Sequence, residues 1–379
     1  MHDALTRYLP ETIVWCAVVA VQAQLARWLM EFIRSAALRA LVWAAASLAC
    51  LSILLSFALS LPKYAVLPGY LVWLRGLILA WGLASFGVFL VVLLWRRLPA
   101  FDPQRRGVVR TAGLAAVTAP FAVAGFGILI ERKDFQLRQV DIAIPGLSKD
   151  LAGLKLLQLT DIHLSPFLSE RDLARVVDIA NETKPQLALI TGDLTTSRGD
   201  PLDACLHQLA RLKADAGIFG CLGNHEIYSG TEYYATRQGA RLGIRFLRRQ
   251  SGTLRFGSAV LNLAGVDYQM VEKPYLPGAQ RLVLPSALNV LLSHNPNVLP
   301  VAAEQGYDIV LSGHTHGGQV AFEILDRNLS PARFHTPYVA GLYREGPTSL
   351  YVSRGVGTIG VPLRLGVPPE ITLVTLCAT

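Results

Sequence analysis

The feature that most constrains this chain is the uneven placement of its apolar residues, which lie almost entirely before about residue 131. Three stretches, Ala40–Leu61, Gly76–Trp95 and Thr111–Ile130, reach the roughly 20 apolar residues that a helix needs to cross a bilayer core. A shorter stretch, Ile13–Ala26, leaves open a further span, an interfacial segment or an uncleaved signal-anchor. The sequence therefore predicts an all-α transmembrane region over residues 1–131 with three or four spans.

The composition of the whole chain agrees with a membrane protein. Hydrophobic residues make up 52% of the sequence and charged residues 16%, whereas soluble domains carry roughly 25% charged residues. The net charge of +8 fits nucleic acid, an anionic membrane surface or a phosphorylated substrate. Because the sequence shows no zinc finger, helix-turn-helix or aromatic-interleaved basic motif, we expect membrane lipids rather than nucleic acid as partners.

The distribution of arginine predicts how the chain is oriented in a membrane. Short loops rich in Lys and Arg stay in the cytoplasm, and the loop between Gly76–Trp95 and Thr111–Ile130 is rich in arginine. Arg132 and Lys133, after the last stretch, point the other way. We expect a multi-pass protein of the cell membrane whose carboxyl-terminal half is extracytoplasmic. The arginines of the loop are Arg96, Arg97, Arg105, Arg106 and Arg110.

After the apolar stretches, short apolar runs alternate with polar, periodic segments. Leu154–Thr160 and Leu187–Thr191 have the pattern of buried strands, and a helix between them begins at a capping-box-like Ser169 and Asp172. Apolar residues at helical spacing follow that cap. An α/β or α+β domain with one large core is therefore expected over residues 150–379. Further strands fit Ile218–Leu222, Ala259–Gly265, Asn289–Ser293, Ile309–Ser312, Leu350–Ser353 and Ile371–Leu376.

Polar clusters follow five of these predicted strands and contain most of the histidines of the chain. In extended chain, residues i and i+2 point to one side, so Asp161 and His163 can bind one ion together, as can His314 and His316. Open α/β sheets place their ligand crevice at the carboxyl ends of the strands. The clusters are Asp161-Ile162-His163, Gly192-Asp193, Gly223-Asn224-His225-Glu226, Ser293-His294-Asn295 and Gly313-His314-Thr315-His316-Gly317-Gly318.

The side chains in these clusters have the chemistry of metal ligands. They offer imidazole, carboxylate and amide oxygen without sulfur, a set that suits Mn²⁺, Fe, Zn²⁺ or similar divalent ions. Seven candidate ligands are too many for one tetrahedral site and suit two ions that share a bridging carboxylate, about 3.5–4 Å apart. Such a pair lowers the pKa of a bridging water and so makes hydroxide available near neutral pH. The candidate ligands are Asp161, His163, Asp193, Asn224, His294, His314 and His316.

With these motifs the chain resembles the calcineurin-like metallophosphoesterase superfamily over about residues 150–379. The tail from Ser353-Arg354-Gly355 to Pro369-Glu370-Ile371 resembles its bacterial membrane-associated branch, which includes phosphodiesterases and relatives of UDP-2,3-diacylglucosamine hydrolase. The resemblance implies a four-layer α/β/β/α sandwich with two central sheets.

The resemblance also implies a role for each residue of the clusters. One ion would be bound by Asp161, His163, Asp193 and His316. The other would be bound by Asp193, Asn224, His294 and His314, with Asp193 bridging. His225 would bind no metal but would contact the phosphate and stabilise or protonate the leaving oxygen, which an imidazole pKa near 6.5 permits.

Two positions depart from the family pattern. Thr196 stands where the family often has the last Asp of Gly-Asp-x-x-Asp, and Glu226 stands where an Asp often follows the Asn-His pair. Because the first Asp of that motif is the bridging ligand, we expect metal binding to survive. The longer carboxylate of Glu226 leaves the surroundings of His225 open.

Arginines outside the clusters have two readings each. Arg237, Arg241 and Arg245 recur at helical spacing, which fits a solvated helix face or contact with lipid headgroups or substrate phosphate. Arg354 and Arg364 lie in the tail that matches the family branch. They fit either a phosphate clamp or structural pairing.

These observations favour a membrane-anchored, metal-dependent phosphoric ester hydrolase with a phosphorylated small molecule, lipid or cell-envelope precursor as substrate. The bond would be a phosphodiester or a pyrophosphate. The alternative is a non-enzymatic membrane sensor or scaffold with structural metals. A transporter is disfavoured because the predicted spans contain almost no ionisable residues.

Overall fold

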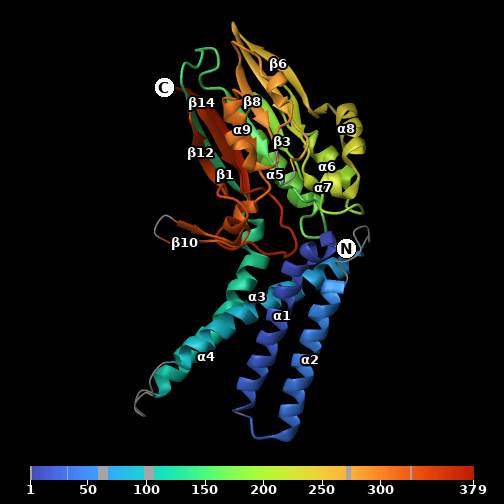
Figure 1. Cartoon of the computed structure of the whole chain (residues 1–379), viewed down its shortest axis with the longest axis vertical. Coiled ribbons are helices and arrows are strands. Elements are labelled where there is room, and N and C mark those ends of the chain that lie inside the picture. The colour runs from blue at the N-terminus through green and yellow to red at the C-terminus, as the bar shows by residue number, and fades with distance from the viewer. Residues whose placement is uncertain (1, 32, 59–66, 98–105, 270–274, 325–326) are drawn as a thin grey trace. The chain divides into compact units, whose positions relative to one another are not determined.

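A computed structural model describes residues 2–31, 33–58, 67–97, 106–269, 275–324 and 327–379 of the chain (Figure 1). The chain divides into two compact units. The first, called here the helical unit, comprises residues 1–128 and 360–362, and the second, the α/β unit, comprises residues 129–359 and 363–379.

Among its described residues, the helical unit contains four helices, and each predicted apolar stretch overlaps one of them. Gly69–Trp95 and Ala115–Lys133 are long and apolar enough to cross a membrane, and the apolar parts of the other two helices are shorter. Residues 59–61 of the first predicted span, and Arg105 of the arginine-rich loop, lie outside the described residues. The helices are α1 (His2–Met30), α2 (Ala36–Ala58), α3 (Gly69–Trp95) and α4 (Arg106–Leu129).

Small residues let these helices approach one another closely. A Cβ atom added to Gly82 of α3 would lie 3.2 Å from Val18 Cγ1 of α1, and one on Gly87 would lie 3.1 Å from Pro120 Cβ of α4. Close backbone approach of this kind is typical of helices that pack without a large hydrophobic driving force between them. The large apolar side chains instead face outward, as Leu48 does with 67% of its surface exposed.

The α/β unit is built on two six-stranded sheets. In the first, strands β2 to β5 run parallel, β14 pairs antiparallel with β2, and β1 pairs parallel with β14. Its order is β1 (Gln136–Ile144), β14 (Glu370–Ala378), β2 (Lys155–Leu159), β3 (Leu187–Thr191), β4 (Ile218–Cys221) and β5 (Ile244–Phe246).

The second sheet also has a mainly parallel centre, but its antiparallel pairs lie at its edges. Strands β7, β8, β9 and β13 run parallel, and the edge strands β6 and β12 pair antiparallel. Its order is β12 (Gly341–Glu345), β13 (Thr348–Val352), β9 (Ile309–Ser312), β8 (Leu288–Leu292), β7 (Ala259–Gly265) and β6 (Gln250–Phe256). A separate two-stranded sheet contains β10 (Phe322–Ile324) and β11 (Arg327–Leu329).

Successive residues of a strand face opposite sides of its sheet, and this alternation builds the layers. Leu156 of β2 and Val290 of β8 lie in the apolar core between the sheets. Their neighbours face outward: Leu157 packs in the core under one helical layer and Leu291 in the core under the other. The predicted four-layer α/β/β/α sandwich is thereby confirmed.

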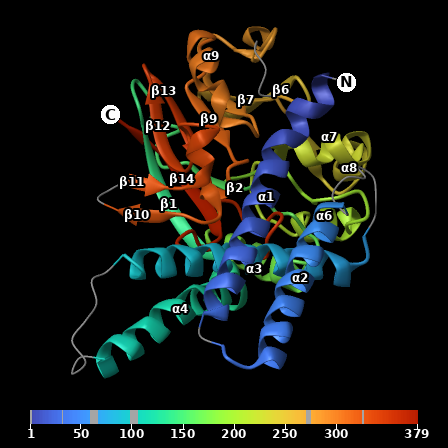
Figure 2. The same cartoon turned by 60° about the horizontal axis from the view of Figure 1, so that its bottom comes forward.

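Helices α6, α7 and α8 group together on one side of the α/β unit, whereas α9 lies beside β12 and β13 (Figure 2). The predicted cap of α5 is present, since the Ser169 side chain accepts a hydrogen bond from Asp172 N and Asp172 reciprocates. The helices are α5 (Glu170–Glu182), α6 (Leu202–Leu209), α7 (Asn224–Ser229), α8 (Glu232–Arg241) and α9 (Leu299–Glu304).

Candidate metal centre

The polar clusters lie at the carboxyl ends of strands β2, β3, β4, β8 and β9, and the fold brings them together. The carboxylate of Asp193, directly after β3, is central. Its Oδ2 lies 3.0 Å from His294 Nε2 and 3.5 Å from His163 Nε2. His314 also belongs to the group around Asp193, with ligand atoms within 4.8 Å of one another. Imidazoles that follow strands of both sheets therefore surround one carboxylate, that of Asp193.

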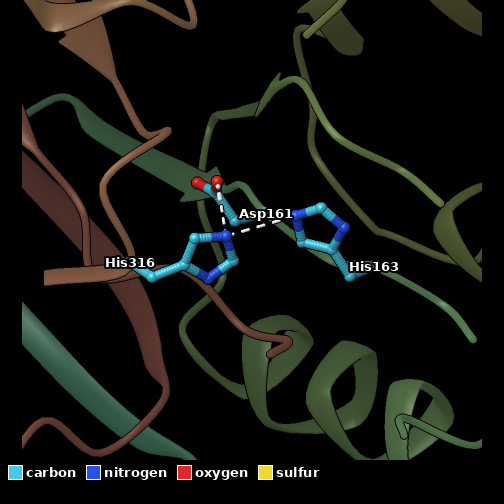
Figure 3. A group of neighbouring side chains, drawn as sticks. All are labelled: Asp161, His163 and His316. Carbon is cyan, nitrogen blue, oxygen red and sulfur yellow. Dashed lines mark hydrogen bonds and ion pairs between the residues drawn. The ribbon is translucent and has the colours of Figure 1, made fainter. Parts of the chain in front are cut away.

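A second group forms around His316. Its Nε2 lies 3.3 Å from Asp161 Oδ1 and 3.2 Å from His163 Nε2. Figure 3 shows the imidazole of His316 turned toward both partners. Because His163 also approaches Asp193, the two groups adjoin. The arrangement places donor atoms around two adjacent points.

This centre is buried. Asp161, His163 and His294 have no exposed surface, and Asp193 is 2% exposed. Within the described part of the chain, three of its polar atoms have no hydrogen-bond partner. Burying such atoms unpaired costs free energy, so the site is suited to a cation that Asn224 Oδ1 and His294 Nε2 could coordinate. The three atoms are Asn224 Oδ1, His294 Nε2, which lies beside the Asp193 carboxylate as an ion-pair contact, and His316 Nδ1 on the other side of the ring from Nε2.

The pKa values show how the centre handles charge. Burial lowers the pKa of His163 and His316, and that of His314 to about 3, so these imidazoles are neutral and keep a lone pair for coordination. Burial acts in the same direction on His294, but Asp193 and Asp161 outweigh it and raise the pKa to about 10. The carboxylates thus attract positive charge to this point.

The backbone at the centre is strained. Asp161, His163, Asp193, His314 and His316 have φ angles of 49°, 46°, 56°, 75° and 52°, the left-handed region that costs a residue other than Gly about 1–3 kcal/mol. Main-chain hydrogen bonds hold the strand ends in place. Asp161 N donates to Gly192 O at 3.0 Å, and His163 N donates to Asp193 O at 3.1 Å.

Close packing explains one glycine of the motifs. Gly192 has a φ of 94°, and a Cβ atom there would lie 2.6 Å from Gly223 N and 2.7 Å from His294 Nδ1. Any larger residue would push the ends of β3 and β4 apart. Asp193 and Asn224, which follow these two glycines, would then separate.

Glu226 has a structural task that the sequence left open. Its carboxylate accepts hydrogen bonds from the backbone N–H groups of Asp193, Leu194 and Gly223 at 3.0, 2.8 and 2.8 Å. It therefore locks the β3 and β4 ends together beneath His225.

Thr196 is a residue that sequence reasoning missed as a supporting group. Its hydroxyl lies 3.0 Å from His163 Nδ1, and its carbonyl accepts a hydrogen bond from His225 Nδ1 at 2.7 Å. Such partners fix the tautomer and orientation of a histidine. The only sequence signal was its departure from the family pattern at this position.

Two tyrosines flank the centre and carried no sequence signal. The Tyr268 ring is buried and lies 5.4 Å from the His314 ring and 6.1 Å from the His294 ring. The Tyr228 ring is 54% exposed and lies 6.1 Å from the ring of His225. The centre is therefore bounded by aromatic rings on two sides.

The arginines noted in the sequence fall into an exposed group and a group in the carboxyl-terminal tail that is partly or fully buried. Arg237, Arg241 and Arg245 are exposed, as expected of a solvated face. Arg354 lies 3.7 Å from Glu370, and Arg364 is fully buried. The buried Arg364 is not available to clamp a substrate phosphate.

The sequence profile described as calcineurin-like phosphoesterase matches residues 154–318. The chain is 32% identical over 300 residues to a transmembrane protein with metallophosphoesterase domain from Danio rerio, covering 75% of this chain and 67% of that protein. It is 34% identical over 248 residues to an uncharacterized metallophosphoesterase of Campylobacter jejuni, covering 64% of this chain and 63% of that protein. It is 29% identical over 276 residues to phosphodiesterase YaeI of Escherichia coli, covering 72% of this chain and 98% of that protein.

Fold, donor set and relatives together define a metallophosphoesterase domain. The chain belongs to the calcineurin-like phosphoesterase family, which confirms the predicted superfamily. This family uses two divalent metal ions, and the clustered Asp and His side chains can bind such ions.

Proposed function

We propose that this chain is a membrane-associated phosphoesterase that uses two divalent metal ions to hydrolyse a phosphodiester or pyrophosphate bond. The observation that carries the proposal is the buried convergence of Asp and His donors from both sheets on Asp193, beside the half-buried His225. The E. coli relative named phosphodiesterase supports this reaction class.

The proposed ligands divide into two sets. Asp161, His163, Asp193 and His316 would bind one ion, consistent with the short contacts of His316 to Asp161 and His163. The second set would be Asp193, Asn224, His294 and His314. It is supported by the contact of His294 with Asp193 and by the unpaired, buried Oδ1 of Asn224. Nitrogen and oxygen donors without sulfur suit Mn, Fe or Zn.

The ions, when bound, supply positive charge that polarises the phosphoryl group and makes hydroxide available near neutral pH. The residues of the chain do the rest. His225 Nδ1 donates to the Thr196 carbonyl at 2.7 Å, so its Nε2 is the atom left to face the substrate. In a protonated His225 this Nε2 would bind a phosphoryl oxygen and deliver its proton to the leaving oxygen.

Backbone contacts hold His225 in register with the proposed metal ligands. His225 N donates to Asp193 Oδ1 at 2.9 Å, so the proposed general acid and the proposed bridging carboxylate belong to one rigid unit. The ring of His225 stands edge-on to that of His163 at 4.8 Å. A proton donor held at this distance from the centre is oriented toward a phosphate bound there.

Membrane association is supported by the apolar helices and by the zebrafish relative named a transmembrane protein. We propose a multi-pass region over residues 1–131 and a catalytic domain over residues 150–379 on the extracytoplasmic side. A phosphorylated lipid or cell-envelope precursor is the matching substrate. Alkaline phosphatase fused to the carboxyl terminus should be active in cells, whereas fluorescence of a green fluorescent protein fusion there would contradict this orientation.

The reaction is tested with the full chain purified in detergent and loaded with Mn²⁺. We expect hydrolysis of bis-p-nitrophenyl phosphate that stops on chelation and returns with added metal. His225→Ala should lose activity but keep its metal content. A wild-type protein that binds two ions yet leaves both this diester and p-nitrophenyl phosphate intact would support the non-enzymatic sensor instead.

A further inference from the structure

The loop between β13 and β14 is organised around one buried cation, Arg364, which has no exposed surface. Among the described residues, its guanidinium donates hydrogen bonds to main-chain carbonyls. Nε donates to Gly357 O at 3.2 Å and Nη1 to Val367 O at 3.2 Å. Nη2 donates to the carbonyls of Arg354, Gly355 and Gly357 at 2.9, 3.0 and 2.6 Å.

The segment that Arg364 holds lies directly against the strained end of β2. Gly357 N donates to Asp161 O at 2.7 Å, and Val356 N donates to Thr160 O at 3.1 Å. A Cβ atom added to Gly355 would lie 2.6 Å from Asp161 Cβ. The loop therefore contacts both the backbone and the side chain of Asp161.

A buried guanidinium is a costly way to satisfy carbonyl groups. Its planar fork nevertheless offers five donors in a fixed geometry, which a lysine cannot reproduce. Burial lowers the pKa of Arg364 to about 10, with Asp161 and Glu370 opposing the shift, so the side chain is a cation at neutral pH. Its charge lies in the field of the Asp161 carboxylate.

We propose that Arg364 is a positioning residue for the metal centre. By binding the carbonyls of Arg354, Gly355 and Gly357, it holds this segment against Asp161 and keeps Asp161 and His163 in their left-handed conformations. Asp161 and His163 are thereby presented to the same ion. The inference rests on the proposed function for the role of these two side chains, but the conformational part stands without it.

The first test needs no metal. Hydrogen–deuterium exchange of the metal-free full chain in detergent is compared for wild type, Arg364→Ala and Leu206→Ala. Leu206 is a fully buried residue of α6, and its truncation serves as a control for general loss of stability. Arg364→Ala should speed exchange in peptides covering residues 156–167 by at least about tenfold. Leu206→Ala, which weakens the core that also contains Leu159 and Ile162, should speed exchange in these peptides no more than in the rest of that core.

The second test measures Mn²⁺ affinity by titration calorimetry. Loss of a supporting partner typically weakens metal binding about 10–100-fold, and we expect Arg364→Ala to fall in this range. Millimolar guanidinium, but not urea, should restore part of the affinity by filling the space of the missing side chain. Arg364→Lys, which keeps the charge without the fork, should lie between wild type and Arg364→Ala and covers the case in which the alanine variant does not fold.

The outcomes separate the two ideas. Wild type that binds no Mn²⁺ would contradict the proposed function but leave the exchange experiment valid. Arg364 variants that exchange like wild type over residues 156–167 and bind Mn²⁺ with unchanged affinity would overturn the positioning role. Loss of affinity that matches Leu206→Ala and ignores guanidinium would overturn it as well.

Discussion

The helical unit exposes large apolar side chains, whereas the α/β unit buries them. Leu48 and Leu94 of the helical unit expose 67% and 65% of their surface, whereas Leu157 and Leu292 of the α/β unit are fully buried. The α/β unit also buries ionisable groups, and it concentrates them at the strand ends around Asp193.

This difference shows what each unit requires from its surroundings. Exposed apolar side chains along a helix are stable in an apolar solvent, and a bilayer supplies one. Buried carboxylates and neutral imidazoles are stable when they coordinate a cation or pair with one another. Single substitutions can test whether the helical unit needs an apolar solvent and whether the α/β unit needs a bound cation.

The largest effect is expected from Asp193→Ala. The change removes the carboxylate that both proposed metal ions share, so hydrolysis of bis-p-nitrophenyl phosphate should fall by at least about 10⁴-fold, beyond the usual contribution of a general acid. Metal content measured by mass spectrometry should fall below two ions per chain. Asp178→Ala is the control, because Asp178 is exposed and forms an ion pair with the exposed Arg211. Full activity in Asp193→Ala would refute the shared-carboxylate assignment.

His225→Ala should separate chemistry from metal binding. The proposed general acid contributes about 10²–10⁴-fold, so kcat should fall within that range while two ions remain bound. The loss should be smaller for a substrate with a good leaving group, because p-nitrophenolate needs little protonation. An equal loss for good and poor leaving groups would argue against proton donation by His225.

A leucine-to-arginine substitution made once in each unit tests whether the helical unit lies in a bilayer. Leu83 of α3 is 52% exposed and Leu342 of β12 is 41% exposed. If α3 lies in a bilayer, Leu83→Arg should cost about 2.5–3.5 kcal/mol of insertion free energy and lower the amount of protein in the membrane fraction. Leu342→Arg, on a water-facing strand, should change stability by less than about 0.5 kcal/mol. Equal behaviour of the two variants would show that α3 faces water.

Thr196→Val should have the smallest effect. It removes the hydroxyl near His163 Nδ1 but keeps the carbonyl that accepts from His225. We expect Mn²⁺ affinity to weaken about tenfold, the lower end for a supporting partner, with little change in the preference for leaving groups. Thr195→Val provides a neighbouring control. If the variant binds Mn²⁺ with wild-type affinity, the Thr196 hydroxyl does not help to orient His163 for metal binding.

Local patterns predicted the apolar helices of the helical unit and the central strands of the α/β unit. Apolar runs marked the helices of the helical unit and strands such as β2 and β3, and the Ser169 cap marked the start of α5. The edge strands β1, β5, β6 and β12 were missed because they are short or only partly buried and lack a continuous apolar run. Alternation alone gave too little signal there.

The sequence motifs also predicted which side chains could meet, and the structure brings the Asp and His side chains of all five clusters into one region. Their roles as ligands remain a prediction. The contacts of the supporting residues could not be foreseen. Thr196 and Glu226 meet groups far away in the sequence, and Arg364 binds carbonyls of a nearby loop whose irregular conformation no local pattern predicts. The left-handed conformation of Asp161 and His163 likewise depends on such contacts.

Anomalous diffraction from crystals of the full chain grown with Mn²⁺ would show directly whether two metal ions share the carboxylate of Asp193. We expect two manganese peaks about 3.5–4 Å apart, with the carboxylate of Asp193 in contact with both and His225 in contact with neither. A single peak, or two peaks that do not share Asp193, would contradict it.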